Sequence, residues 1–103
     1  MNILICGGSG YLGGLIANSL CNNHNIIVGT RRLDKIKNYK RNITFKKVNY
    51  NSLKNFKNKN KKIDLIIHLA ALCVVSEGEK LKNKYFRNNV IGTKNLIKIC
   101  KKF

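Results

Sequence analysis

The stretch that decides the fold is residues 1–20, which read MNILICGGSGYLGGLIANSL. Residues 2–6 form a short apolar run, which is typical of a strand buried on both faces. Three glycines then interrupt this run, at Gly7, Gly8 and Gly10. From Tyr11 onward apolar residues recur at helical spacing, at Leu12, Leu15, Ile16 and Leu20. The order predicts a strand, a glycine-rich turn and a helix.

The glycines are spaced as Gly7-x-x-Gly10-x-x-Gly13. This spacing lets the chain turn sharply, brings bare backbone against a pyrophosphate, and allows a helix to pack close to a strand. The unpaired N–H groups of the first helical turn favour an anion there. No Lys or Arg precedes Arg31, so the backbone would hold the phosphate. The segment lacks the Gly-Lys-Ser/Thr ending of a nucleotide-hydrolase loop, and the alternative is a tight turn with no ligand.

The length of 103 residues gives room for one domain, residues 1–103, that is able to bury a core. No apolar run reaches the roughly 18 residues that a membrane span needs. The start of the sequence also lacks the basic lead and cleavage site of a signal peptide. We therefore expect a cytoplasmic protein that does not associate with a membrane.

The cysteines are scattered through the chain, at Cys6, Cys21, Cys73 and Cys100. They form no Cys-x-x-Cys pair and have no His at ligand spacing. This pattern predicts buried reduced thiols and neither a metal site nor a disulfide framework.

The net charge of +17 raises the alternative of a basic nucleic-acid-binding domain. Thirteen of the 21 basic residues lie between Arg31 and Lys62, where Asp34 is the one acid. Lys, Asn and Ile are over-used along most of the chain, as in the product of an AT-rich coding sequence. The basic run also lacks aromatic platforms at regular intervals. We therefore expect weak attraction to polyanions and no specific nucleic-acid partner.

A second strand is predicted over residues 26–30, after a polar turn. Dinucleotide-binding folds that use NAD carry an Asp or Glu at the end of this strand, to bind the ribose 2′-hydroxyl. Thr30 stands there instead and is followed by Arg31 and Arg32. Two guanidinium groups without a carboxylate favour a 2′-phosphate and hence NADP(H). The alternative is that both arginines belong to the general basic excess.

The remaining segments alternate between strand-like and helix-like patterns. We predict short helices over residues 33–41 and 52–56, a strand over 43–48, a fourth strand over 63–71, irregular chain over 72–83 and a last helix from residue 84. Inward positions of the third strand are Ile43, Phe45 and Val48. The fourth strand is apolar almost throughout, as expected of a strand covered on both faces. The last helix carries apolar residues at Phe86, Val90, Leu96, Ile97 and Cys100.

Tyr50 and Lys54 have the Tyr-x-x-x-Lys spacing that short-chain dehydrogenases use for proton transfer. A lysine-rich chain produces such a match by chance, and this one follows the third strand, far from where that chemistry belongs. We reject it as a catalytic pair.

Three motifs in order carry a resemblance to a known family. Residues 7–13 read GGSGYLG after a strand, residues 68–71 read HLAA at the end of the fourth, and residues 89–96 read NVIGTKNL on a helix. Together they resemble the N-terminal portion of an extended short-chain dehydrogenase/reductase, the NAD-dependent epimerase/dehydratase family. The resemblance spans nearly the whole chain.

The resemblance implies an α/β fold with a Rossmann-like, partial doubly wound parallel sheet. Its four strands would lie in the order 3-2-1-4, with helices on both faces. The glycines would then face residues 69–71 across the switch point, where open α/β sheets bind ligands.

The resemblance also implies a set of cofactor contacts. Tyr11 and Leu12 would lie along the pyrophosphate, small side chains would let the cofactor approach the backbone, Asn49 would meet the adenine, and Asn89 would support the active-site backbone. The complete predicted set is Gly7, Gly10, Tyr11, Leu12, Gly13, Arg31, Arg32, Asn49, Leu69, Ala70, Ala71 and Asn89. Their ordinary alternatives are core packing for Tyr11 and the alanines, and a helix-surface group for Asn89. His68 occupies a structural position in the family motif, so we expect a hydrogen-bonded core histidine.

Family members are about three times as long and carry a catalytic Ser or Thr and a Tyr-x-x-x-Lys after a fifth strand. We expect these 103 residues to be the cofactor-binding part of a sugar-nucleotide epimerase, dehydratase or reductase, truncated or split, with NADP or else NAD as cofactor and no turnover alone. The alternative is a stand-alone NADP-binding or redox-sensing module. The unpaired edge of the fourth strand predicts self-association or a complementing chain.

Overall fold

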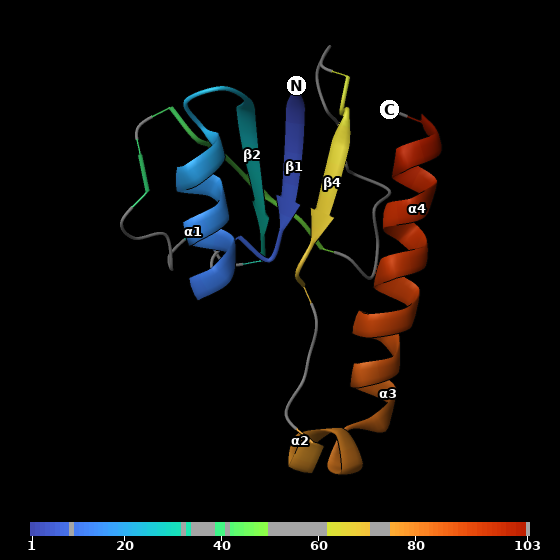
Figure 1. Ribbon diagram of the computed structural model, residues 1–103. Helices are drawn as coiled ribbons and strands as arrows, with labels where there is room; N and C mark the ends of the chain where they lie inside the picture. Colours follow the sequence, from blue (N-terminus) through green and yellow to red (C-terminus); the bar gives the residue numbers. More distant parts are fainter. Residues whose placement is uncertain are drawn as a thin grey trace.

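The structure is a computed structural model that describes residues 1–8, 10–31, 33, 39–40, 42–49, 62–70 and 75–102. Its strands are β1 (Asn2–Cys6), β2 (Asn25–Thr30), β3 (Thr44–Lys47) and β4 (Leu65–His68). They form one parallel sheet in the order β3-β2-β1-β4 (Figure 1). The α/β class and the strand order predicted from the sequence are confirmed.

β1 is the centre of the sheet and pairs with β2 on one side and β4 on the other. Ile5 lies opposite Val28 of β2 and Ile67 of β4. Residues 3–6 are at most 1 % exposed, because helices cover both faces of this strand. The uninterrupted apolar run of β1 is what such a position demands.

The helices are α1 (Tyr11–Leu20), α2 (Val75–Lys80), α3 (Lys82–Phe86) and α4 (Gly92–Lys102), with a π-helix, η2 (Arg87–Ile91), between α3 and α4. Figure 1 shows α1 and α4 on opposite sides of the sheet. The sheet is therefore covered on two faces, as the doubly wound arrangement requires.

Side chains of alternate β1 residues pack into two separate hydrophobic cores, one on each face of the sheet. One core, on the α1 side, contains Ile3, Ile5, Ala17, Cys21, Ile26, Val28 and Ile43. The other, on the α4 side, contains Leu4, Cys6, Ile27, Val48, Ile63, Leu96 and Ile99.

The inward face of α1 differs from its apolar pattern. Gly13 and Ala17 are buried, whereas Leu12 and Leu15 are 56 % and 50 % exposed. The reason is the close approach of the helix to the preceding turn, which admits only a glycine at position 13. The predicted helix is confirmed, although two of its four leucine and isoleucine positions face solvent.

The third and fourth strands are shorter than predicted. Ile43 and Val48 are buried at the ends of β3, and Phe45 is half-buried, so the predicted inward positions are broadly confirmed. β4 lies at the edge of the sheet, where Leu65 is 42 % exposed and His68 is exposed. Ile66 nevertheless packs against the core on the α4 side and Ile67 against the core on the α1 side, so both faces of β4 are partly covered and its ends are exposed.

The predicted loop at residues 76–79 is wrong, because α2 runs through it and α3 begins before residue 84. Glu77 holds this helical pair together. Its carbonyl accepts the Leu81 N–H at 2.8 Å, and its Oε2 accepts the Tyr85 hydroxyl at 3.0 Å. Glu77 in the first turn and Lys80 in the last also suit the helix dipole. α2 is therefore stabilised by polar contacts, and its sequence shows no apolar periodicity that would have predicted a helix.

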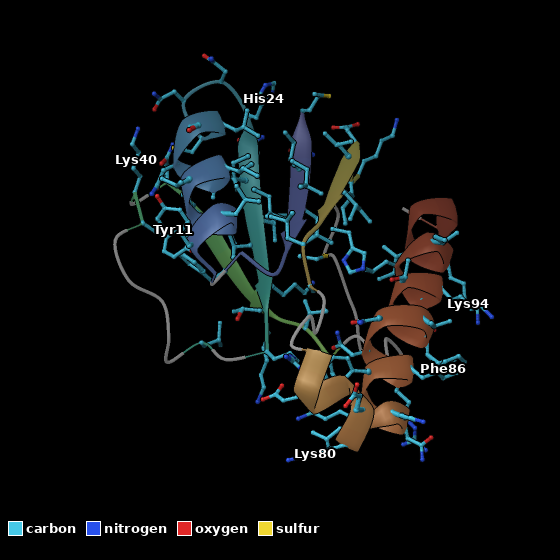
Figure 2. All side chains as sticks on the ribbon, turned by 60° about the horizontal axis from the view of Figure 1, so that its bottom comes forward. Tyr11, His24, Lys40, Lys80, Phe86 and Lys94 are labelled. Atoms are coloured by element: carbon cyan, nitrogen blue, oxygen red, sulfur yellow. The ribbon has the colours of Figure 1, made fainter. Side chains whose placement is uncertain are left out.

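The inward face of the last helix also differs from the prediction. Asn88, Gly92, Leu96 and Ile99 are buried. Phe86 and Ile97 are 55 % and 52 % exposed, and Figure 2 shows Phe86 and Lys94 pointing away from the sheet. A π-turn holds more residues than an α-turn, so η2 shifts the phase of the helix on either side of it. The apolar positions named from the sequence therefore do not share one buried face: Leu96 is buried, whereas Phe86 and Ile97 are exposed.

Several predictions lie outside the described residues, among them the helix at 52–56, most of that at 33–41, Cys73 and the side chain of Cys100. Cys6 and Cys21 are buried free thiols, as predicted.

Candidate functional site

The glycine turn, defined here as Gly7, Gly8, Gly10 and Gly13, joins β1 to α1 at the carboxyl end of the sheet. Gly7 has a φ of 82°, in the left-handed region that L side chains rarely adopt. Its N–H donates to the Gly29 carbonyl of β2 at 3.1 Å, and its carbonyl accepts the Gly10 N–H at 3.2 Å. The turn is therefore fixed to the neighbouring strand and to the start of the helix.

The turn packs directly against the chain that leaves β4. A Cβ on Gly7 would lie 2.8 Å from the Ala70 nitrogen and 2.8 Å from the Leu69 carbonyl carbon. A Cβ on Gly13 would lie 2.6 Å from the Gly8 Cα. The predicted juxtaposition of the glycines with Leu69 and Ala70 is confirmed, and Ala71 lies outside the described residues.

Gly10 differs from the other glycines of the turn because it has space around it. Among the described residues, a Cβ there would meet one atom within 4 Å, the Gly7 carbonyl oxygen at 3.5 Å. Gly10 caps α1 with no side-chain hydrogen bond, and the first turn of α1 contains no acid. The N–H groups that a helix leaves unpaired at its start are thus open to an anion.

Tyr11 and Leu12 lie at the mouth of this turn. Their side chains are 85 % and 56 % exposed, and Figure 2 shows Tyr11 at the start of α1. The alternative that Tyr11 is a core residue is therefore wrong. Both side chains are free to cover a ligand seated on the turn.

The helical wall, defined here as Lys84, Arg87 and Asn88 of α3 and η2, contacts the chain that leaves β4. Asn88 is 5 % exposed. Its Nδ2 donates to the Ala70 carbonyl at 3.4 Å and to Asn89 Oδ1 at 3.0 Å. Asn88 thus connects the wall to the chain beside Gly7, while Asn89 is half-buried behind it. The sequence motif pointed to Asn89, and the adjacent Asn-Asn pair was the signal that both needed consideration.

His68 ties β4 to the helix that carries this wall. Its Nε2 lies 2.9 Å from Thr93 Oγ1, and the Thr93 hydroxyl donates to the Asn89 carbonyl at 2.6 Å. Because Thr93 has one hydroxyl proton, its oxygen accepts from His68, which places a proton on Nε2. Burial lowers the pKa of His68, which favours the neutral ring. His68 is hydrogen-bonded as predicted, but it is exposed and not a core residue.

The ends of β2 and β3 complete the carboxyl edge of the sheet. Thr30 is 2 % exposed, and its carbonyl accepts the Val48 N–H at 2.8 Å. Arg31 and Asn49, which follow these two residues, are both exposed at this edge. Arg32 lies outside the described residues.

A cavity of about 260 Å³ lies between the end of β2 and the helical wall. Its lining residues are Arg31, Asn83, Lys84, Arg87 and Asn88. In the described ranges, no group of three or more His, Cys, Asp or Glu side chains is placed to hold a metal ion.

The model of the NAD dependent epimerase/dehydratase family matches residues 3–103. The chain belongs to this family. It is 30 % identical to the UDP-glucose 4-epimerase uge1 of Schizosaccharomyces pombe, over 98 % of this chain and 32 % of that protein. The family assignment confirms the resemblance inferred from the three motifs.

Solved structures give the same picture. The UDP-Glc/GlcNAc 4-epimerase of Campylobacter jejuni is 27 % identical with a TM-score of 0.81, over 98 % of this chain and 33 % of that one. A UDP-glucose 4-epimerase crystal structure is 25 % identical with a TM-score of 0.82, over all of this chain and 32 % of that one. The chain therefore spans about a third of the length of the relatives that it matches.

Among the residues that the structure describes, every helix is too short or too polar to cross a membrane.

Proposed function

We propose that this chain binds a nicotinamide dinucleotide, with the diphosphate on the glycine turn and the N-terminus of α1. The observation that carries the proposal is the contact of Gly7 with the backbone of Leu69 and Ala70. Both segments follow the carboxyl ends of adjacent parallel strands, β1 and β4, and open α/β sheets bind ligands at such a switch point. The family to which the chain belongs is named for its dependence on NAD.

Within this proposal each predicted contact residue has a role. Gly7 and Gly13 shape the turn, while Gly10 leaves the space that the diphosphate fills. Tyr11 and Leu12 cover it, and Leu69 and Ala70 form the opposite side. The predicted role of Ala71, which lies outside the described residues, stays a prediction. Asn49 would contact the adenine. Asn88 and Asn89 would support the backbone of the binding site. The bound group supplies the hydride-accepting chemistry, and the chain supplies binding and orientation.

A substitution at Gly10 tests the proposal without disturbing the fold. Its φ of −81° and ψ of 172° suit any residue, so Gly10→Val should fold normally and fill the diphosphate space. We expect Gly10→Val to weaken NADH and NADPH alike, by about a hundredfold or more, measured by calorimetric titration. The matched control is Gly14→Ala, inside α1 and away from the space, which should bind as the wild type does. Wild-type affinity in a folded Gly10→Val chain would refute the proposal.

We also propose that the preferred cofactor is NADP(H). Arg31 is exposed directly after the buried Thr30, at the strand end where an NAD-binding protein carries an acid. Changing Arg31 and Arg32 to Ala should weaken NADPH far more than NADH in the same titration. Equal losses would count against the preference.

The chemistry of the complete protein is proposed to be epimerisation, dehydration or reduction of a sugar nucleotide, by analogy with the UDP-glucose epimerases that it resembles. We propose that the 103 residues bind the cofactor and need further residues for turnover. The open edge of β4, with Leu65 exposed, is the proposed site of pairing with another strand from a second copy or a complementing chain. A cytoplasmic location stays a prediction.

A further inference from the structure

The cavity between β2 and the helical wall has an unusual charge. Arg31 reaches it from the end of β2, and Lys84 and Arg87 reach it from α3 and η2. Asn83 and Asn88 are neutral, so the described residues of the lining carry three positive charges and no negative one.

Within the described ranges these cations have no acidic partner. Among the described residues, none of Arg31, Lys84 and Arg87 forms an ion pair with a carboxylate. Lys84 and Arg87 are three residues apart on a helical segment, where like charges repel. A cluster of this kind lowers its self-repulsion when an anion enters it.

The cavity is separate from the place proposed for the diphosphate. Its lining includes no residue of the glycine turn. Its volume of about 260 Å³ is also below the roughly 300–1,000 Å³ of pockets that hold a whole ligand. It therefore suits a second anionic group on a ligand whose remainder lies outside the cavity.

We infer that Lys84 and Arg87 bind the phosphomonoester at the adenosine 2′ position of NADP(H), opposite Arg31. The inference rests on the proposed function, because it places the ribose at the end of β2, where dinucleotide-binding folds hold the 2′ oxygen. The phosphomonoester carries more charge than the hydroxyl of NADH and accepts charge-assisted hydrogen bonds from both side chains. Asn88 fixes this wall to the Ala70 carbonyl, so the two cations face a defined position.

The test removes two charges from the wall and, separately, two from the same helical segment outside it. Lys84→Gln with Arg87→Gln should weaken NADPH about tenfold or more and NADH less than about twofold. Lys94→Gln with Lys98→Gln is the matched control, since both lysines are exposed on α4 and line no part of the cavity. Figure 2 shows Lys94 pointing away from the sheet. The control should bind NADPH as the wild type does.

Three results would overturn the inference: equal losses for NADPH and NADH, an equal loss in the control, or a wild type with the same affinity for both cofactors. In the last case the proposed dinucleotide binding would stand. A wild type that binds neither cofactor would instead refute the proposed function. Adenosine 2′-phosphate is a smaller probe, which should compete with NADPH in the wild type and lose that ability in Lys84→Gln with Arg87→Gln. Circular dichroism confirms that each variant is folded.

Discussion

The glycine turn and the helical wall both contact the chain that leaves β4, at Ala70, and are built in different ways. The turn works through its backbone, since Gly7 has a φ of 82° and no room for a Cβ beside Ala70. The wall works through side chains, since Lys84 and Arg87 are exposed and line the cavity together with Arg31. The turn fixes the shape of the site, and the wall adjusts its charge.

This difference has a consequence for substitutions. A change at Gly7 or Gly13 puts a Cβ within 3 Å of backbone atoms and should lower stability together with binding. A change in the exposed part of the wall should alter the choice of ligand and leave stability nearly intact. Stability and binding can therefore be separated at Gly10 and in the helical wall, and not at Gly7 or Gly13.

The largest effect is expected at Gly7. Gly7→Ala places a Cβ 2.8 Å from backbone atoms at a positive φ, and should lower the free energy of unfolding by about 3–5 kcal/mol. Gly14→Ala is the control in the same helix–turn unit, where a Cβ would meet Tyr39 at an ordinary 3.4 Å. It should raise stability by about 0.5–1 kcal/mol, because alanine favours a helix over glycine. Urea unfolding measures both, and equal losses would show that the turn does not depend on Gly7.

A smaller effect is expected where α4 anchors the wall to the sheet. Leu96 is 3 % exposed, so Leu96→Ala should cost about 2–4 kcal/mol of unfolding free energy. The adjacent Ile97 is 52 % exposed, and Ile97→Ala should cost less than about 0.5 kcal/mol. The same urea experiment compares the two. A larger loss at Ile97 would mean that the helix presents the face expected from a continuous α-helical repeat.

The sequence was sufficient to predict the strand order and the glycine turn. The glycine turn follows from local rules, namely an apolar run buried on two faces and glycines at a spacing that a tight strand-to-helix turn requires. The strand order was implied by the resemblance to a known family that the three motifs carry. The face of the last helix could not be read in this way, because η2 changes the helical phase and nothing in Arg87–Ile91 marks a π-turn. α2 was missed because its helix depends on the contacts of Glu77 with Leu81 and Tyr85.

The residues of the candidate site were also predictable only in part. The approach of Ala70 to Gly7 was predictable from the motifs, since both follow the carboxyl ends of adjacent parallel strands. Lys84 and Arg87 were not predicted as site residues. They are two of 21 basic residues, and nothing in the sequence distinguishes them from the others before the fold places them at a cavity. Asn88 was missed because the motif pointed to its neighbour Asn89. The helical phase decides which of the two is buried, and the sequence does not give that phase.

The smallest effect is expected from His68, the link between β4 and the helix that carries the wall. Burial lowers the pKa of His68 below its ordinary value of 6.5, so the unfolded chain binds its proton more readily than the folded chain. The contribution of this residue to stability is therefore fully present above pH 6.5 and declines as the pH falls toward the folded pKa. The hydrogen bond to Thr93 survives protonation, because Nε2 donates in both forms.

The decline should not exceed about 0.5 kcal/mol, because His68 is exposed and solvent screens most of the cost. Urea unfolding at pH 7.5 and pH 5 should show this loss in the wild type and a smaller one in His68→Gln, whose amide can still donate to Thr93. An NMR titration of the His68 ring in the folded and urea-unfolded chain reads the cause directly. A folded pKa at or above the unfolded one would mean that the helical wall is held to β4 by a charged histidine, and that acidification strengthens this link.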